Sequence, residues 1–215
     1  MRHTSLAQNG IWFTEHAVDA GSAYHIPLSV VLRGDLDADA LAAACGDVVT
    51  RHPLLACGLS ESDGVLTLAD TERPVLERVT EEALSKRELI TRPFGDGPLA
   101  RFTLLERPDA YELLIVVHHM VFDGASKDIL LRDLAACYNA RVAGTAPELP
   151  AAPPDYTEHV EGETERVAAA LEQYRNRPAL GFSDCLILET ARKAGHIPLG
   201  TFDRNLSKLD GAEGL

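Results

Sequence analysis

Two adjacent histidines, His118 and His119, are followed at short range by Asp123 and Gly124, and these residue types at this spacing suit proton transfer. An imidazole can act as a general base, while a carboxylate a few residues away can orient the groups around it. The structural alternative is one histidine hydrogen-bonded in the core and the other solvated. Residue types and spacing leave both interpretations open. A metal site is disfavoured, because adjacent strand residues face opposite ways and no further His or Cys lies at ligand spacing.

A strand and a helix are expected to position these residues. The uninterrupted apolar run 113–117 predicts a central strand covered on both faces, with the histidines at its end. Because successive strand residues point to opposite faces, only one of the pair can face a given cavity. Ser126 is expected to cap a helix that continues to about residue 141. Asp123 and Gly124 therefore fall in the turn between strand and helix.

The rest of the chain alternates between strand and helix patterns, which predicts an α/β fold with a mixed sheet flanked by helices. Strands are expected over residues 24–32, 54–59, 65–68, 99–105, 111–117 and 199–201. Helices are expected over a segment capped by Asp35 or Asp37 that runs to about residue 51, and over residues 81–89, 126–141, 163–175 and 183–194. Asp63-Gly64 predicts a hairpin, residues 107–110 a turn, and the Pro- and Ala-rich residues 144–154 a linker.

Composition places the chain among globular proteins, with 46% hydrophobic and 25% charged residues. No apolar run reaches the length of a membrane span, and the first residues lack the apolar core of a secretion signal. The four cysteines contain no Cys-x-x-Cys pair, which predicts reduced, buried thiols. A net charge of -13 disfavours a nucleic-acid-binding surface. We therefore expect a cytoplasmic protein with neither a membrane nor a nucleic-acid partner.

The segment around the histidines resembles the HHxxxDG signature of condensation domains from nonribosomal peptide synthetases, which belong to the chloramphenicol-acetyltransferase-like acyltransferases. Four further segments resemble motifs of that family in the same order, and together they cover roughly residues 1–160. These segments are Ser5-Leu6-Ala7-Gln8 with Ile11-Trp12-Phe13, Tyr24-His25-Ile26-Pro27, Arg51-His52-Pro53-Leu54-Leu55, and Arg92-Pro93-Phe94 with Gly97-Pro98-Leu99.

The resemblance implies a chloramphenicol-acetyltransferase-like half-domain over residues 1–160, the N-terminal of the two lobes of a condensation domain. It also implies acyl transfer that forms an amide or ester bond between carrier-bound thioesters. By position, His119 would be the base or positioning group that faces the substrate tunnel, while His118 would have a structural part. Asp123 would hold the loop, and Gly124 would let the backbone pass close to the substrate arm.

The implied partners are carrier proteins whose phosphopantetheine arms present the thioesters, with no cofactor bound directly. A second lobe, or self-association of this chain, would be needed to complete the tunnel. The alternative is a catalytically incomplete module that docks carrier or synthetase partners, so activity of this single lobe stays open. A docking surface for acidic carrier proteins would need basic residues, and the candidates close in sequence are Arg78, Lys86, Arg87 and Arg92.

Residues 161–215 resemble the C-terminal part of PIN-domain ribonucleases, so a small helical, PIN-like fragment is expected there. In that family, acidic residues at the positions of Asp184 and Asp203 help to bind Mg²⁺ or Mn²⁺, and hard cations require several carboxylate oxygens. A metal-dependent ribonuclease is therefore the third functional hypothesis. The structural alternatives are a helix cap for Asp184 and a turn residue for Asp203.

Overall fold

A computed structural model describes the chain except for residues 19, 81–83, 108–109, 153–155 and 178–179. The chain forms two compact units, Met1–Pro153 and Pro154–Leu215. Helix α5 (Tyr156–Asn176) begins before the expected residue 163 and runs across residues 160 and 161, where the sequence suggested a boundary. Val160 is buried within this helix. A buried apolar position thus lies before residue 163, where the sequence prediction placed the helix start.

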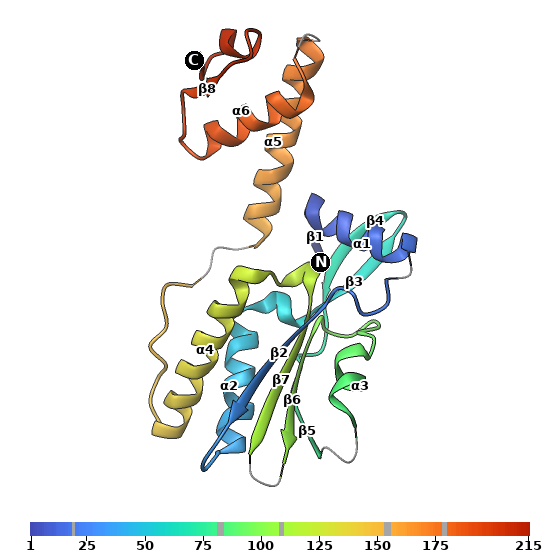
Figure 1. Ribbon diagram of the computed structural model, residues 1–215, viewed down its shortest axis with the longest axis vertical. Helices are drawn as coiled ribbons and strands as arrows, with labels where there is room; N and C mark the ends of the chain where they lie inside the picture. Colours follow the sequence, from blue (N-terminus) through green and yellow to red (C-terminus); the bar gives the residue numbers. More distant parts are fainter. Residues whose placement is uncertain (19, 81–83, 108–109, 153–155, 178–179) are drawn as a thin grey trace. The chain divides into compact units, whose positions relative to one another are not determined.

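A four-stranded mixed sheet forms the centre of the first unit (Figure 1). Its strands, in order, are β2 (His25–Leu32), β7 (Tyr111–His118), β6 (Ala100–Glu106) and β5 (Leu76–Thr80). β7 pairs antiparallel with both neighbours, whereas β5 runs parallel to β6. Residues 107–110, where a turn was expected, connect β6 to β7, and residues 108 and 109 lie outside the described part. The expected mixed sheet is therefore confirmed.

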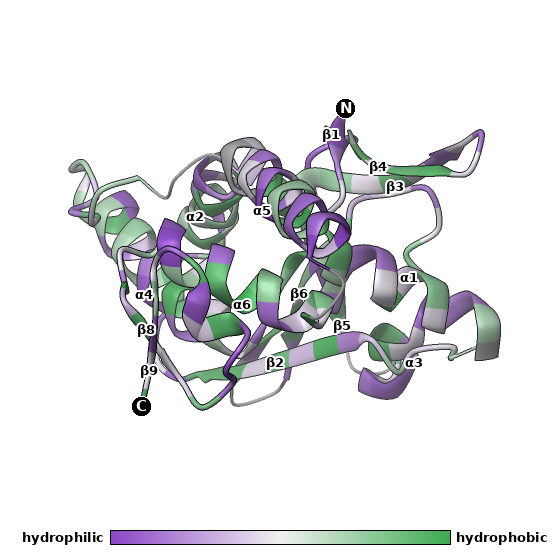
Figure 2. Ribbon diagram, turned by 90° about the horizontal axis from the view of Figure 1, so that it is seen from above, coloured by the Kyte–Doolittle hydropathy of each residue, from purple (hydrophilic) through white to green (hydrophobic). Residues whose placement is uncertain are grey.

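Helices cover both faces of this sheet (Figure 1). α2 (Ala38–Arg51) and α4 (Gly124–Ala143) pack on one face, and α3 (Lys86–Thr91) packs on the other. Strand β7 serves both layers, because Leu113, Ile115 and Val117 join the core with α2 and α4, while Leu114 and Val116 join the core with α3. This division explains why β7 is continuously apolar. Edge strand β2, in contrast, mixes polar and apolar residues (Figure 2).

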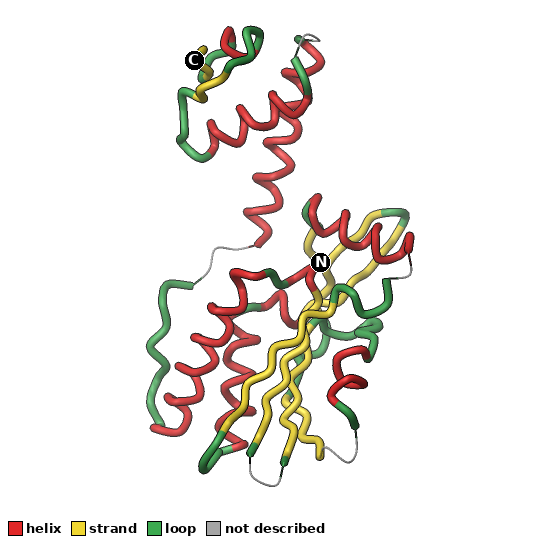
Figure 3. The backbone as a smooth tube through the Cα atoms, viewed as in Figure 1, coloured by secondary structure: helices red, strands yellow, loops and turns green. Residues whose placement is uncertain are grey.

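A smaller three-stranded antiparallel sheet lies in the same unit (Figure 3). Its strands, in order, are β1 (Arg2–His3), β4 (Val65–Asp70) and β3 (Cys57–Ser62). The expected hairpin forms, since Asp63 and Gly64 both have positive φ angles, of 54° and 77°. β3 begins later than the sequence predicted, because residues Pro53–Ala56 form a 3₁₀ turn behind the proline.

Further helix starts and several elements differ from the sequence prediction. α4 is capped by Asp123 rather than Ser126, which instead takes the third helical position of a reciprocal capping box. α3 starts after its cap Ser85, later than expected, and the expected residues 81–83 lie outside the described part. Helix α1 (Leu6–Val18) and strand β5 were not predicted at all.

The second unit contains α5, α6 (Phe182–Lys193) and a short parallel pair, β8 (Leu199–Thr201) with β9 (Ala212–Gly214). Its own apolar core consists of Ala170, Leu180, Cys185, Leu188, Leu206 and Leu209. Within the described residues of the whole chain, no helix is both long and apolar enough to cross a membrane.

Candidate functional site

His118 is the last residue of β7, and its side chain is enclosed by the first unit. Only 3% of the residue is exposed. Its Nδ1 accepts a hydrogen bond from the backbone N–H of Met120 at 3.2 Å, and its Nε2 lies 3.3 Å from Oε1 of Glu15. Because Nδ1 accepts, the hydrogen of the neutral ring must be on Nε2, which donates a hydrogen bond to the Glu15 carboxylate. Burial outweighs the nearby carboxylate and lowers the pKa of His118, so the ring is neutral at pH 7.

Aromatic rings surround His118. The ring centroids of Phe94, His25 and Tyr24 lie 5.7, 6.0 and 6.3 Å from that of His118. His25 is the cross-strand partner of His118 in the β2–β7 ladder. Its Nδ1 donates to the carbonyl oxygen of Ile90 at 2.7 Å, which ties the end of β2 to α3. The His118 ring is thus packed against Phe94, His25 and Tyr24, and its neighbour His25 is itself held by α3.

His119 begins a 3₁₀ turn, His119–Val121, and its side chain is exposed. Its backbone N–H donates to the carbonyl oxygen of Tyr24 at 2.8 Å, and its ring meets the Tyr24 ring edge-on at 6.4 Å. Among the described residues, none hydrogen-bonds to the nitrogens of this ring. The strand has already ended at His118, so it is the 3₁₀ turn, rather than strand alternation, that turns the two imidazoles to different environments.

Asp123 and Gly124 form the start of α4. Oδ1 of Asp123 accepts from the hydroxyl of Ser126 at 2.6 Å and from its backbone N–H at 2.8 Å. These hydrogen bonds, the hydroxyl one first, hold the pKa of Asp123 below its ordinary value. Gly124 has no positive φ, and a Cβ at this position would meet no atom within 4 Å. The described part of the unit therefore does not itself require a glycine there.

Helix α1 also contributes to the site, and sequence reasoning missed it. Nε2 of Gln8 donates to the carbonyl oxygen of Met120 at 2.7 Å, and Glu15 binds His118 as described above. The signal that could have revealed α1 is the Ser-x-x-Gln pattern of a capping box, in which the backbone N–H of Ser5 donates to Oε1 of Gln8 at 2.9 Å.

The Arg51-His52 segment lies in a separate buried network. Oδ2 of Asp133 accepts from Nε of Arg51 at 2.8 Å and from Nε2 of His52 at 2.9 Å, while Arg132 holds Oδ1. Burial would raise the pKa of Asp133, but these hydrogen bonds outweigh it and lower the pKa. Arg51 also donates to the carbonyl oxygens of Pro150 and Ala151 in the linker. This motif therefore holds α2, α4 and the linker together.

The basic residues considered for carrier docking are largely paired with acids. Arg78 lies 2.7 Å from Glu106, Lys86 lies 2.5 Å from Glu112, and Arg92 lies 3.1 Å from Glu77. Glu112 is buried, and hydrogen bonds from Lys86 and Ser29 overcome its burial and lower its pKa. These pairs compensate three of the four candidate residues, and the fourth, Arg87, is exposed.

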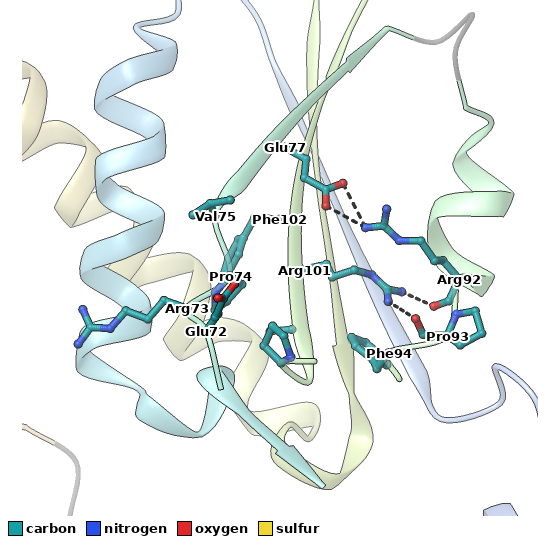
Figure 4. Close-up of a pocket in the computed structure, with 12 residues that line it drawn as sticks. Glu72, Arg73, Pro74, Val75, Glu77, Arg92, Pro93, Phe94, Arg101 and Phe102 are labelled. Carbon is teal, nitrogen blue, oxygen red and sulfur yellow. Dashed lines mark hydrogen bonds and ion pairs between the residues drawn. The ribbon is translucent and has the colours of Figure 1, made fainter. Parts of the chain in front are cut away.

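A surface pocket of about 320 Å³ lies between the segment preceding β5, the end of α3 and the start of β6 (Figure 4). Arg101 points into it, donates to the carbonyl oxygens of Arg92 and Pro93, and lies 4.1 Å above the Phe94 ring. Burial lowers the pKa of Arg101 to about 10. Neither histidine of the pair lines this pocket, and the donors of Arg101 are used to close the C-terminal end of α3.

Asp184 and Asp203 each close a local turn. Asp184 accepts from the backbone N–H of Gly181 at 3.2 Å, and Asp203 accepts from those of Asn205 and Leu206 at 2.7 and 2.8 Å. Across the described parts of the chain, no three His, Cys, Asp or Glu side chains gather in a way that could hold a metal ion. The two aspartates do not fit the metal-binding set of a PIN domain.

Comparison with known protein families shows to which family this chain belongs. The Condensation domain family matches residues 2–176. The chain belongs to the condensation-domain family. The match extends past residue 161, and a relative from Mycobacterium tuberculosis, isonitrile lipopeptide synthase, aligns with 87% of the chain at 32% identity over 216 residues. No comparison supports the expected PIN-like fragment.

Other curated relatives of this condensation-family chain are nonribosomal peptide synthetases. The probable non-canonical synthetase CymA of Salinispora arenicola is 36% identical over 161 residues, which is 72% of this chain and 2% of the relative. The dimodular synthase of Bacillus subtilis is 38% identical over 155 residues, 67% of this chain and 6% of the relative. The chain thus spans a small fraction of the curated relatives that it matches.

Solved structures agree on the fold. The starter condensation domain of rhizomide synthetase RzmA aligns with a TM-score of 0.68 at 20% identity, covering 82% of this chain and 47% of that one. The X-domain, solved in complex with OxyB from teicoplanin biosynthesis, aligns with a TM-score of 0.65 at 28% identity, covering 81% and 42%. The expected chloramphenicol-acetyltransferase-like fold is confirmed, and the chain spans about half of these solved chains.

Proposed function

We propose that this chain provides the histidine-bearing lobe of a condensation domain, which joins two carrier-bound thioester substrates through an amide or ester bond. The observation that carries the proposal is the contrast between the two histidines. His118 is buried with both ring nitrogens engaged, whereas His119 exposes its ring on a turn held by backbone hydrogen bonds. Membership of the condensation-domain family makes acyl transfer the chemistry to expect at that ring.

In the proposed reaction, the acceptor amine attacks the carbonyl carbon of the donor thioester. A C–N bond forms and the C–S bond breaks, and the proton lost by the amine ends on the sulfur of the donor arm. His119 accepts or orients the amine proton, a role that typically contributes about 10²–10⁴-fold to the rate. His118 supports the turn, Asp123 caps the following helix, and Gly124 leaves room for the substrate arm.

The proposed partners are carrier proteins, whose phosphopantetheine arms bring the thioesters; no cofactor is bound by the lobe itself. Because His119 is exposed in the lobe, the proposal requires a second wall over the ring to exclude water. A second lobe, or a second copy of this chain, is the proposed source of that wall.

The experiment is product formation from a donor thioester and an amine acceptor by the native chain and by His119→Ala. We expect the turnover number to fall by about 10²–10⁴-fold in the variant. His3→Ala, at another exposed histidine of the same unit, should retain the native rate. An undiminished rate in His119→Ala contradicts the proposal, whereas absence of turnover from the well-folded native chain alone favours the docking module described next.

A docking module without chemistry is the second candidate. It is favoured by the likeness to an X-domain that was solved in complex with another protein, OxyB. Titration calorimetry with a carrier protein tests this candidate: binding by the native chain and equally by His119→Ala, in the absence of turnover, is the expected result. Lack of binding at micromolar concentrations contradicts it. We propose no nuclease function, since Asp184 and Asp203 serve as turn caps.

A further inference from the structure

We propose that Gln8 and Glu15 of helix α1 are positioning residues for the turn that carries His119. Neither side chain contacts the His119 ring. Both act on the backbone of the next residue, Met120: Gln8 binds its carbonyl oxygen directly, and Glu15 acts on its N–H through His118. The consequence for turnover rests on the function proposed above, whereas the positioning itself can be observed without any turnover.

The N–H and the carbonyl group of Met120, which belong to two successive peptide groups, are both held in a buried environment. Its N–H donates to Nδ1 of His118, and its carbonyl oxygen accepts from Nε2 of Gln8 at 2.7 Å. Gln8 is only 6% exposed, and Met120 is also buried. Water therefore cannot replace either partner easily, and the loss of one leaves a buried polar group unsatisfied. Since the Met120 N–H belongs to the peptide group that joins His119 to Met120, these two hydrogen bonds set where the His119 backbone lies.

Glu15 selects the tautomer of His118 that this arrangement needs. Its carboxylate can only accept, so it favours the hydrogen on Nε2 and leaves the lone pair of Nδ1 for the Met120 N–H. The opposite tautomer would direct a ring N–H at the N–H of Met120. Glu15 therefore acts on the turn through His118, in the manner of a carboxylate that orients an imidazole.

Helix geometry explains why one helix provides both groups. Glu15 follows Gln8 by seven residues, which is about two helical turns, so the two side chains lie on the same face of α1. Gln8 is itself fixed, since its Oε1 accepts from the backbone N–H of Ser5 while its Nε2 reaches Met120. The Gln8 side chain thus both caps helix α1 and contacts the His119–Val121 turn.

The first measurement is the tautomer of His118, read from its ring ¹⁵N chemical shifts, together with the backbone amide shifts of His119 and Met120. Glu15→Ala should turn the Nε2–H form into a mixture of tautomers and move both amide signals. Glu15→Gln keeps an oxygen acceptor and should restore the native spectrum. Thr14→Ala, at an exposed position of the same helix, is the matched control and should leave these signals unchanged.

Gln8→Glu separates positioning from helix capping. A glutamate still accepts from Ser5 and completes a Ser-x-x-Glu capping box, but it cannot donate to the Met120 carbonyl. The helix should therefore remain folded while the His119 and Met120 amide signals move. In the turnover assay, Glu15→Ala and Gln8→Glu should each lower kcat about tenfold or more with KM little changed, and Glu15→Gln should recover most of the rate.

The outcomes separate this inference from the proposed function. If Glu15→Ala or Gln8→Glu folds and keeps the native His118 tautomer and turn signals, positioning by α1 is overturned. If Glu15→Ala does not fold, native signals in folded Gln8→Glu still overturn it. If the signals move as expected but His119→Ala forms product at the native rate, the positioning inference is supported and the proposed chemistry fails.

Discussion

The partners of each ring nitrogen decide which histidine of the pair can exchange a proton with a substrate. In His118, Nε2 faces Glu15 and Nδ1 accepts from Met120, so any transfer would first break a buried hydrogen bond. The His119 ring has no such commitment within the described residues and is exposed. The two adjacent histidines therefore differ in their capacity for proton exchange because their surroundings differ.

The buried state of His118 predicts a pH dependence of stability. Burial lowers its pKa in the folded chain below the unfolded value of about 6.5. As the pH falls through that value, His118 binds a proton in the unfolded chain but not in the folded chain, so the free energy of unfolding decreases. We expect the urea midpoint of the first unit to be lower at pH 5.5 than at pH 7.5, and this difference to be smaller in His118→Gln.

The control for this measurement is His3→Gln, which changes an exposed histidine in the same unit. It should keep the native difference between the two pH values. An equal pH dependence in native chain and His118→Gln would mean that other groups cause it, and that the neutral form of His118 does not contribute to stability in this range.

The sequence revealed some site residues and concealed others for a physical reason. His118, His119 and Asp123 are close neighbours in the chain, so their spacing alone points to a shared site. Glu15 lies 103 residues before His118, and Gln8 lies 112 residues before Met120, so only the fold brings them together. The cap of α4 was ambiguous, because Asp123 and Ser126 bond reciprocally and either type can cap a helix.

At the scale of elements, an acid at the centre of a buried network joins α2 to α4. Asp133 is fully buried and accepts from Arg51, His52 and Arg132. Asp133→Asn removes the charge that these donors compensate, and we expect a loss of unfolding free energy on the order of 3 kcal/mol. Urea denaturation followed by circular dichroism measures this loss.

Asp128→Asn is the matched control, because Asp128 lies on the same helix with a side chain that is 85% exposed. Its effect should stay within about 0.5 kcal/mol. If both substitutions have equally small effects, Asp133 does not join the two helices energetically, and the Arg51-His52 segment has another purpose.

Elements with strong apolar patterns were predictable, and elements held by tertiary contacts were not. β7 was predicted because both of its faces are buried, which makes its sequence continuously apolar. β5 was missed because this edge strand has the sequence Leu-Glu-Arg-Val-Thr and is largely exposed, so it lacks the alternation of a half-buried strand. α1 was missed because its two polar anchors bury against a distant turn rather than forming an apolar stripe.

At the scale of the whole molecule, each unit encloses its own apolar core. The core of the first unit unites α2, α4 and the central sheet, whereas the core of the second unit, as far as its residues are described, contains six buried residues from α5, α6 and the segments between and after them. A smaller core provides less hydrophobic stabilisation. We therefore expect two thermal transitions, with the second unit unfolding at the lower temperature.

One substitution in each unit tests this expectation. Leu188 is fully buried, so Leu188→Ala should destabilise the second unit by about 2–5 kcal/mol and move only the lower transition. Asp133→Asn should move only the upper one, as followed by differential scanning calorimetry. A single transition shifted by both variants would contradict independent units. Independence has a consequence for the site: because Gln8, Glu15 and the histidine pair all belong to the first unit, its stability alone would govern how firmly His119 is held.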